Sequence, residues 1–225
     1  MADGWRSATR ITIRSVAELA ISLGLVLAVF VFYLLVWTNH RTEAAQADLA
    51  ADFRSDKAAA ATEKADRLRK PRSGEGLGIL YIPELGKDWS KVIVEGVEDA
   101  DLARGPGHFP GTALPGEVGN FAVAGHRATH GEPFADLDRL AVGDDIIVET
   151  MDGWLTSQVT WVRIVGPSAV EVLEPVAGHP GAEAKQRTLT LITCHPRWSS
   201  TERLVVGASL VERRTAEAGP PAAVA

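Results

Sequence analysis

Cysteine is nearly absent from this chain of 225 residues, which contains only one, Cys194. A single cysteine excludes an intrachain disulfide and a zinc site built from several thiolates. An excess of positive charge is also missing, because 29 acidic residues outnumber 23 basic ones. Proteins that coat nucleic acid need basic surfaces, so the net charge of −6 argues against a nucleic-acid partner. The sequence has no Walker-type loop and no G-x-G-x-x-G pattern, and we predict no cofactor.

Charge is missing altogether from residues 19–37, which read LAISLGLVLAVFVFYLLVW. At 1.5 Å per residue, a helix of this length covers nearly the whole hydrocarbon core of a bilayer. We therefore predict a transmembrane signal anchor at 19–37. A cleaved signal peptide ending near Ala45-Gln46-Ala47 is the alternative, and it is less favoured because the apolar run exceeds the usual length of about 7–15 residues.

The flanks of the apolar run predict its orientation. Basic residues tend to stay in the cytoplasm, and the segment 1–18 contains Arg6, Arg10 and Arg14. We therefore expect a cytoplasmic N-terminus, a single-pass anchor in the cell membrane and an extracellular body. Residues 38–75 are rich in alanine and in charges of both signs, which favours a solvated, partly helical juxtamembrane stalk.

The remainder of the chain is typical of a mainly β domain, which we place at 76–214. Short segments rich in Val, Ile, Leu and Thr alternate with Gly and Pro breaks. The predicted strands are 78–82, 91–97, 119–126, 145–151, 154–165, 188–195 and 203–212. About seven short strands with few helices indicate a closed or nearly closed β-barrel. One short helix is expected at 132–140, where Pro133 favours a helix start, and the tail 215–225 is expected to be disordered.

Cys194 ends the apolar strand TLTLITCH and precedes His195-Pro196. A buried core cysteine is a common alternative for this residue type. However, a lone thiol on the oxidising side of a membrane needs a reason to persist. A strand end beside a Pro-containing loop is also where reactive groups are usually displayed. Cys194 is therefore a candidate nucleophile, and it would need a neighbouring imidazole or guanidinium to favour its thiolate.

His126 is the histidine best placed to assist Cys194, because it too ends an apolar strand, Asn120–Ala124 followed by Gly125. His195 is adjacent to Cys194 but should point to the opposite face of the strand. The other histidines are His40 in the stalk, His108 and His179 in loops, and His130 in the turn after His126. Arg203 begins the last strand, nine residues after Cys194, where a tight loop would return it beside the thiol. A fixed cation there can stabilise a developing oxyanion, and Arg127 and Arg197 are competing candidates for this role.

These motifs together resemble the sortase family. The stretch Thr190-Leu191-Ile192-Thr193-Cys194, with Arg203 nine residues on, is similar to the sortase T-L-x-T-C signature and its arginine. Ala124-Gly125-His126-Arg127 matches the histidine segment, and the run 105–140 resembles class E sortases of actinobacteria.

The resemblance implies an eight-stranded β-barrel and a transpeptidation reaction. Cys194 would be the nucleophile, His126 its proton-transfer partner and Arg203 the oxyanion contact. The implied substrates are secreted proteins that carry a C-terminal LAxTG or LPxTG sorting signal, cleaved between Thr and Gly through a thioacyl-enzyme. The implied acceptor is an amine of the cell wall.

Two other functions remain as alternatives. A zinc-dependent hydrolase would use His126, His130 and Cys194, although Gly125 and Gly131 bracket the two histidines and disfavour a ligand-bearing helix. A membrane-tethered binding domain without catalysis would leave Cys194 simply buried.

Overall fold

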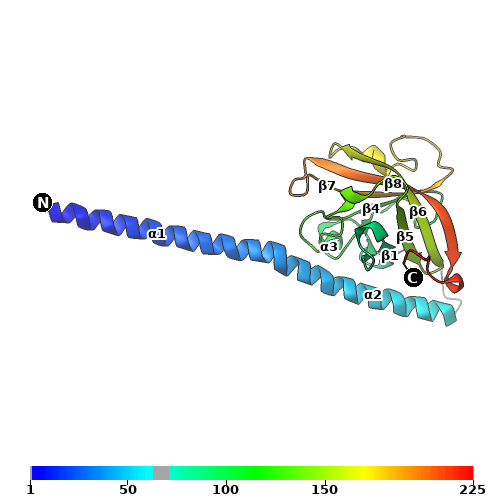
Figure 1. Ribbon diagram of the computed structural model, residues 1–225, viewed down its shortest axis with the longest axis horizontal. Helices are drawn as coiled ribbons and strands as arrows, with labels where there is room; N and C mark the ends of the chain where they lie inside the picture. The colour runs from blue at the N-terminus through cyan, green and yellow to red at the C-terminus, as the bar shows by residue number, and fades with distance from the viewer. Residues whose placement is uncertain (1, 63–70, 225) are drawn as a thin grey trace.

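Eight strands close into a barrel in the order β1-β2-β3-β4-β7-β8-β6-β5. The computed structural model describes residues 2–62 and 71–224, with a long N-terminal helix beside the barrel (Figure 1). The strands are β1 (Gly76–Tyr81), β2 (Ser90–Glu95), β3 (Gly107–His108), β4 (Gly119–Ala124), β5 (Asp145–Thr150), β6 (Gly153–Val165), β7 (Arg187–His195) and β8 (Glu202–Thr215). The predicted closed barrel of eight strands is therefore confirmed.

The connections between strands differ from prediction in two places. β3 lies in a Gly- and Pro-rich segment where the sequence indicates only a loop, and two residues are too few to show a strand pattern. The α-helix expected over 132–140 does not form, since only Leu137–Arg139 makes a short 3-10 turn, η3. Glu132 has a φ of 44°, which is incompatible with starting a right-handed helix there. A short α-helix occurs instead at α3 (Asp99–Leu102).

Alternation along β4, β7 and β8 separates an inner from an outer barrel face. The inner residues of these strands belong to the main hydrophobic core, and they are Phe121, Val123, Leu189, Leu191, Leu204 and Val206. Even-numbered residues of β4 and β7 and odd-numbered residues of β8 therefore face outward. β4 runs parallel to β7, and β7 runs antiparallel to β8.

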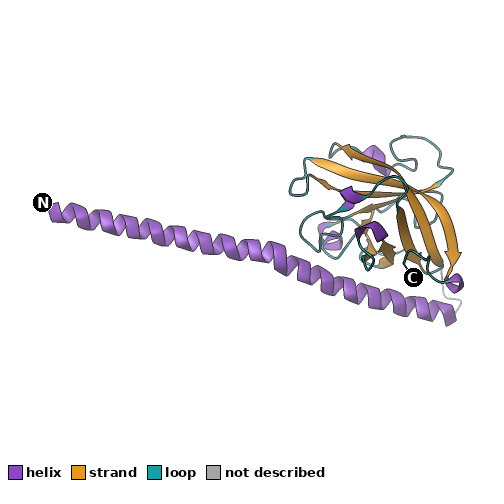
Figure 2. Cartoon of the chain, in the orientation of Figure 1, coloured by secondary structure: helices purple, strands orange, loops and turns teal. Residues whose placement is uncertain are grey.

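The N-terminal helix consists of α1 (Ala2–Phe32), one π-helical turn η1 (Tyr33–Trp37) and α2 (Thr38–Thr62). α1 projects away from the barrel, whereas α2 runs beside it (Figure 2). The apolar side chains of the predicted span are almost all exposed. This helix is long and apolar enough to cross a membrane.

α2 packs on the barrel, where the sequence predicts a solvated stalk. Leu49 and Phe53, one turn apart, are buried against Ile79 of β1 and against Val92 and Val94 of β2. All other apolar residues of α2 are alanines, so no long apolar stripe reveals this contact in the sequence. The second half of the predicted stalk includes residues 63–70, which lie outside the described residues.

Polar side chains extend the contact along the same face of α2. The Gln46 amide donates to the carbonyls of Val92 (3.1 Å) and Arg104 (2.7 Å) and accepts from the Val92 N–H at 2.7 Å. Lys57 forms an ion pair of 2.7 Å with Glu149 at the far end of α2. Positions 38, 42, 46, 49, 53 and 57 follow a spacing of three or four residues, which places them on one side of a helix.

The C-terminal tail also has described structure. A 3-10 turn, η5 (Ala216–Ala218), follows β8, and Pro221 is buried. The sequence predicts disorder for 215–225, whereas the structure has defined turns up to Val224. Ala225 lies outside the described residues. A chain that returns to the barrel surface after β8 can remain ordered without an apolar pattern of its own.

Candidate active site

Cys194 and Arg203 lie opposite each other on neighbouring strands. They are register partners in the antiparallel pair of β7 and β8, and such partners have Cα atoms about 4.5–5.5 Å apart. Both residues face outward by the alternation described above. Cys194 is half-buried and is a free thiol. The loop Pro196–Thr201 is therefore the tight return that the nine-residue spacing predicts.

His126 follows β4 by two residues, on the other side of β7. The last parallel pair is Ala124 with Ile192. The two chains stay together beyond it, because the Gly125 N–H donates to the Ile192 carbonyl at 3.0 Å. Extending this register by two residues brings His126 beside Cys194, with the same outward parity.

The Cys194 thiol and the His126 ring are not hydrogen-bonded to each other within the described part of the chain. Hydrogen bonds between catalytic groups often form only when substrate binds, so the lack of one between Cys194 and His126 is compatible with catalysis by this pair. A Cβ on residue 125 would lie 2.6 Å from the ring of the buried Phe134. Glycine therefore lets the chain pass close to the barrel core immediately before His126.

The environment of His126 disfavours its protonated form. Burial is the largest cause that lowers its pKa below 6.5, and the neighbouring His130 lowers it further, while Asp99 acts in the opposite direction. The rings of His126 and His130 are stacked, with centroids 4.8 Å apart. The imidazole of His126 is therefore neutral over more of the pH range than an exposed histidine would be.

His130 lies in a turn with unusual backbone angles. Thr129, His130, Gly131 and Glu132 all have positive φ, at 63°, 49°, 74° and 44°. The left-handed conformation costs about 1–2 kcal/mol for each residue other than glycine. Such a turn persists only where its surroundings hold it in place. The Glu132 carboxylate contributes by accepting from the Thr129 N–H at 3.3 Å and by pairing with Arg197.

Arg203 presents its guanidinium at the edge of the β7–β8 loop. Its Nη1 donates to the carbonyls of Ser200 and Glu202, each at 2.9 Å. Within the described residues, its Nε and Nη2 groups have no hydrogen-bond partner. The arginine is therefore fixed by its own loop and retains N–H donors for an oxyanion or carbonyl oxygen.

Arg127 and His195 form a separate contact on the opposite side of the two strands. Arg127 is 5% exposed and donates to His195 Nδ1 at 2.6 Å. It also pairs with Asp138 at 2.8 Å. Because a guanidinium only donates, the His195 ring accepts through Nδ1 and is engaged away from Cys194. Sequence reasoning missed this pair, although both residues directly follow the candidate His126 and Cys194.

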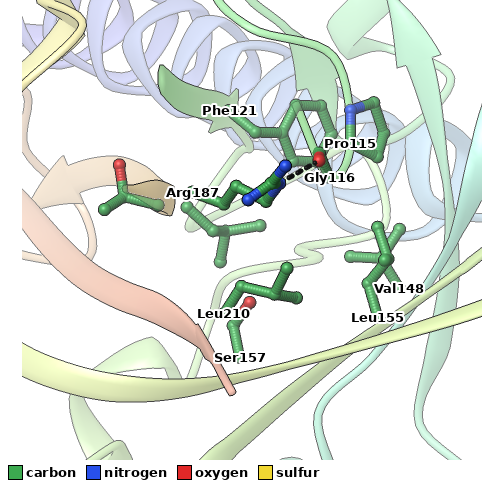
Figure 3. A pocket seen from close by; sticks show the side chains of 10 residues that line it. Pro115, Gly116, Phe121, Val148, Leu155, Ser157, Arg187 and Leu210 are labelled. Atoms are coloured by element: carbon green, nitrogen blue, oxygen red, sulfur yellow. Dashed lines mark hydrogen bonds between the residues drawn. The ribbon is translucent and has the colours of Figure 1, made fainter. Parts of the chain in front are cut away.

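His108 and His179 make contacts with residues other than those of the candidate site. His108 is buried and forms a 2.6 Å pair with Glu95, which ties β3 to β2. His179 lies in the β6–β7 loop, beside an outer pocket of about 550 Å³. A smaller cavity of about 20 Å³ lies near the start of β7, where Arg187 donates to Gly116 (Figure 3). Seven residues of strand, about 23 Å, separate Arg187 from Cys194, so this cavity is remote from the candidate site.

No group of three or more His, Cys, Asp or Glu side chains is arranged to hold a metal ion within residues 2–62 and 71–224. His126 and His130 stack face to face, which aligns ring planes rather than pointing two nitrogens at a common centre. The described geometry therefore does not favour the zinc-dependent alternative.

Comparison with known proteins identifies the same family that the sequence motifs resemble. The sortase domain family matches residues 80–211. Sortase SrtE1 of Streptomyces coelicolor is 38% identical in an alignment of 222 positions that covers 94% of this chain, and the chain spans only 60% of the length of that protein.

Two solved structures are also similar to this chain. Sortase E from Streptomyces avermitilis is 40% identical with a TM-score of 0.62, and the match covers 68% of this chain and 99% of that one. Sortase E1 from Streptomyces coelicolor, solved with a tripeptide in the active site, is 38% identical with a TM-score of 0.63, covering 69% of this chain and 100% of that one. The likeness thus includes nearly the whole of each solved chain.

Proposed function

The chain belongs to the sortase family, in its class E, and from this premise we propose that it is a membrane-anchored cysteine transpeptidase. The observation that supports this most directly is the common outward face of Cys194, His126 and Arg203. These residues lie on or just beyond three neighbouring strands, at the end of β7 where the candidate nucleophile is half-buried. A nucleophile, a proton carrier and an oxyanion donor are the groups that acyl transfer requires.

The first half of the reaction forms a thioester. The Cys194 thiolate attacks the threonine carbonyl of a Thr–Gly bond, and Arg203 stabilises the oxyanion of the tetrahedral intermediate. When the intermediate collapses, the C–N bond breaks and the imidazolium of His126 donates a proton to the leaving glycine amine. The product is a thioacyl-enzyme on Cys194 and a neutral His126.

The second half transfers the acyl group to an amine. The incoming amine attacks the thioester, His126 accepts its proton, and the Cys194 thiolate leaves. The new amide forms without ATP because the thioester retains the reactivity needed for aminolysis. We propose that the donor is a secreted protein with an LAxTG or LPxTG sorting signal and that the acceptor is a cell-wall amine.

The segment 19–37 is proposed as the membrane anchor, with 1–18 in the cytoplasm, 38–75 as the juxtamembrane segment and 76–214 as the extracellular catalytic domain; 215–225 is proposed as the C-terminal tail. An anchored enzyme meets exported donors and membrane-attached acceptors at one surface, which raises their effective concentration.

Trapping the acyl-enzyme tests this function. The full chain, incubated with a panel of LAxTG and LPxTG peptides, is expected to gain the mass of the peptide up to threonine on Cys194, as read by mass spectrometry. An added amine should convert the adduct into a transpeptidation product, and a chelator should have no effect. Alkylation of Cys194 without any acylation would favour the binding domain, and chelator-sensitive turnover restored by zinc would favour the hydrolase.

Replacement of Arg203 by alanine is expected to lower kcat/KM for such a peptide by about 10²–10³-fold, because an oxyanion donor is lost. Lysine retains the charge but not the planar fork of donors, so Arg203→Lys should recover only part of the rate. Steady-state kinetics measure both variants. Arg163, whose guanidinium lies 5.0 Å from the Trp161 ring centroid, provides the control, and Arg163→Ala should retain wild-type turnover. Equal losses in the two alanine variants would contradict this role for Arg203.

A further inference from the structure

The first two residues after the apolar run bond to the turn that carries His130. The Asn39 side-chain oxygen accepts from the Gly131 N–H at 2.8 Å. The Thr38 hydroxyl accepts a longer hydrogen bond of 3.4 Å from the His130 N–H, and Thr38 is 6% exposed. These contacts join residues that are 92 positions apart in the chain.

The turn closes on itself through the Glu132 N–H, which donates to the Thr129 carbonyl at 2.9 Å, whereas the N–H groups of His130 and Gly131 donate to α2. Its four residues have positive φ, a conformation that persists only where neighbouring groups enforce it. α2 supplies two hydrogen-bond acceptors and also a surface, because a Cβ on Gly131 would lie 2.8 Å from the Thr42 methyl group. Thr42 is itself fixed by donating to the Ala103 carbonyl at 2.7 Å. The turn is therefore shaped against α2 at a distance that only glycine permits.

The turn at 129–132 supports the ring of His126 through His130. The His130 ring stacks on the His126 ring with centroids 4.8 Å apart. On its other side the turn is held to the β7–β8 loop by the Glu132 pair with Arg197. A displacement of His130 would remove one wall of the His126 imidazole.

We propose that Asn39 and Thr38 are positioning residues for His126, so that the helix continuing from the membrane anchor is part of the catalytic apparatus. This inference rests on the proposed function, in which His126 carries the proton between Cys194 and the amines. Asn39 and Thr38 touch no substrate. They act through the left-handed turn and the His130 ring, and they would set the position of the imidazole rather than bind the peptide.

The test uses the full chain in lipid nanodiscs, with an LAxTG peptide and an amine acceptor. Asn39→Ala should lower kcat by about 10-fold or more, since a small misplacement of a catalytic group has effects of this size. KM should stay within about 2-fold, because binding contacts remain. Asn39→Asp keeps an oxygen acceptor for the Gly131 N–H and should restore most of the rate. Lys57→Met is the matched control, since it removes a contact at the far end of α2 and should leave kcat unchanged.

A second readout needs no substrate. In isotope-labelled chain, the imidazole resonance of His126 should shift in Asn39→Ala and remain in place in Asn39→Asp and Lys57→Met. A wild-type kcat and an unshifted resonance in Asn39→Ala would overturn the inference, and so would an equal loss of kcat in Lys57→Met. If Asn39→Ala does not fold, the near-isosteric Thr38→Val takes its place. If the wild-type chain turns over no peptide, the proposed function fails while the resonance still decides the positioning role.

Discussion

Cys194→Ala is expected to lower the rate of peptide cleavage and transfer by at least about 10⁴-fold, because no group remains to form the thioester. The chain contains no other cysteine, so no second thiol of the protein can replace Cys194 as nucleophile or form an adduct of its own. Mass spectrometry should find no acyl adduct on the variant, and product analysis should find no cleavage between Thr and Gly.

The fold should survive this substitution. Cys194 is half-buried at a strand end and lies outside the main core, so alanine leaves no large cavity. An unchanged melting temperature and circular dichroism spectrum are the controls that separate chemistry from folding. Turnover retained in a folded Cys194→Ala chain would overturn the cysteine mechanism.

His126→Ala is expected to lower kcat/KM by about 10²–10⁴-fold, the range for loss of a general acid–base group. His179→Ala is the matched control, because His179 has no hydrogen bond or ring contact with Cys194, His126 or Arg203 among the described residues and should not affect the rate. His126→Ala should slow the chemical step and leave peptide binding unchanged. The Kd for the peptide, measured in the non-acylating Cys194→Ala chain, should therefore be similar with and without His126→Ala. A rate in His126→Ala close to that of wild type would exclude this residue as the proton carrier.

The pH profile gives an independent measure of the same residue. Burial and His130 lower the pKa of His126 below 6.5. In the proposed mechanism one proton moves between Cys194 and His126, and a second proton binds His126 only when the pH falls below that pKa. The acid limb of kcat/KM should therefore lie below pH 6.5.

His130→Asn should move this acid limb to higher pH, because a neighbour that disfavours the imidazolium is removed and the pKa of His126 rises. Steady-state measurements from about pH 4 to 9 bracket the ordinary pKa values of the groups concerned. A limb that stays in place would mean that another group controls it.

Much of the barrel is predictable from local pattern. The strands with Val, Ile and Leu at alternating positions are readable because their inner faces fill one core. The proximity of Cys194 and Arg203 is also predictable, since a short loop between adjacent antiparallel strands can place two residues nine positions apart opposite each other. β3 is not, because its two residues gain their pairing from β2 and β4 rather than from any pattern of their own.

The docking of α2 and the turn at 129–132 lie beyond what the sequence indicates. In α2 only Leu49 and Phe53 supply large buried apolar side chains, and the remaining contact is made by polar groups such as Gln46. Whether a polar side chain bonds to solvent or to a distant strand depends on tertiary structure. The positive φ of His130 likewise follows from contacts with residues almost a hundred positions away, which local propensity does not contain.

The unbroken course from α1 through η1 into α2 has a consequence for how the barrel sits at the bilayer (Figure 1). If 19–37 spans the membrane with its C-terminal end outside the cell, as proposed above, Thr38 and Asn39 lie at that outer end, and the turn that they bond lies next to His126. In that arrangement a barrel packed against this helix would have little rotational freedom, and its height above the lipid headgroups would be set by the helix. Membranes of different thickness change the tilt of a spanning helix. A thinner or thicker bilayer would then tilt the barrel as one body with its anchor, and with it the direction in which Cys194 faces the membrane plane.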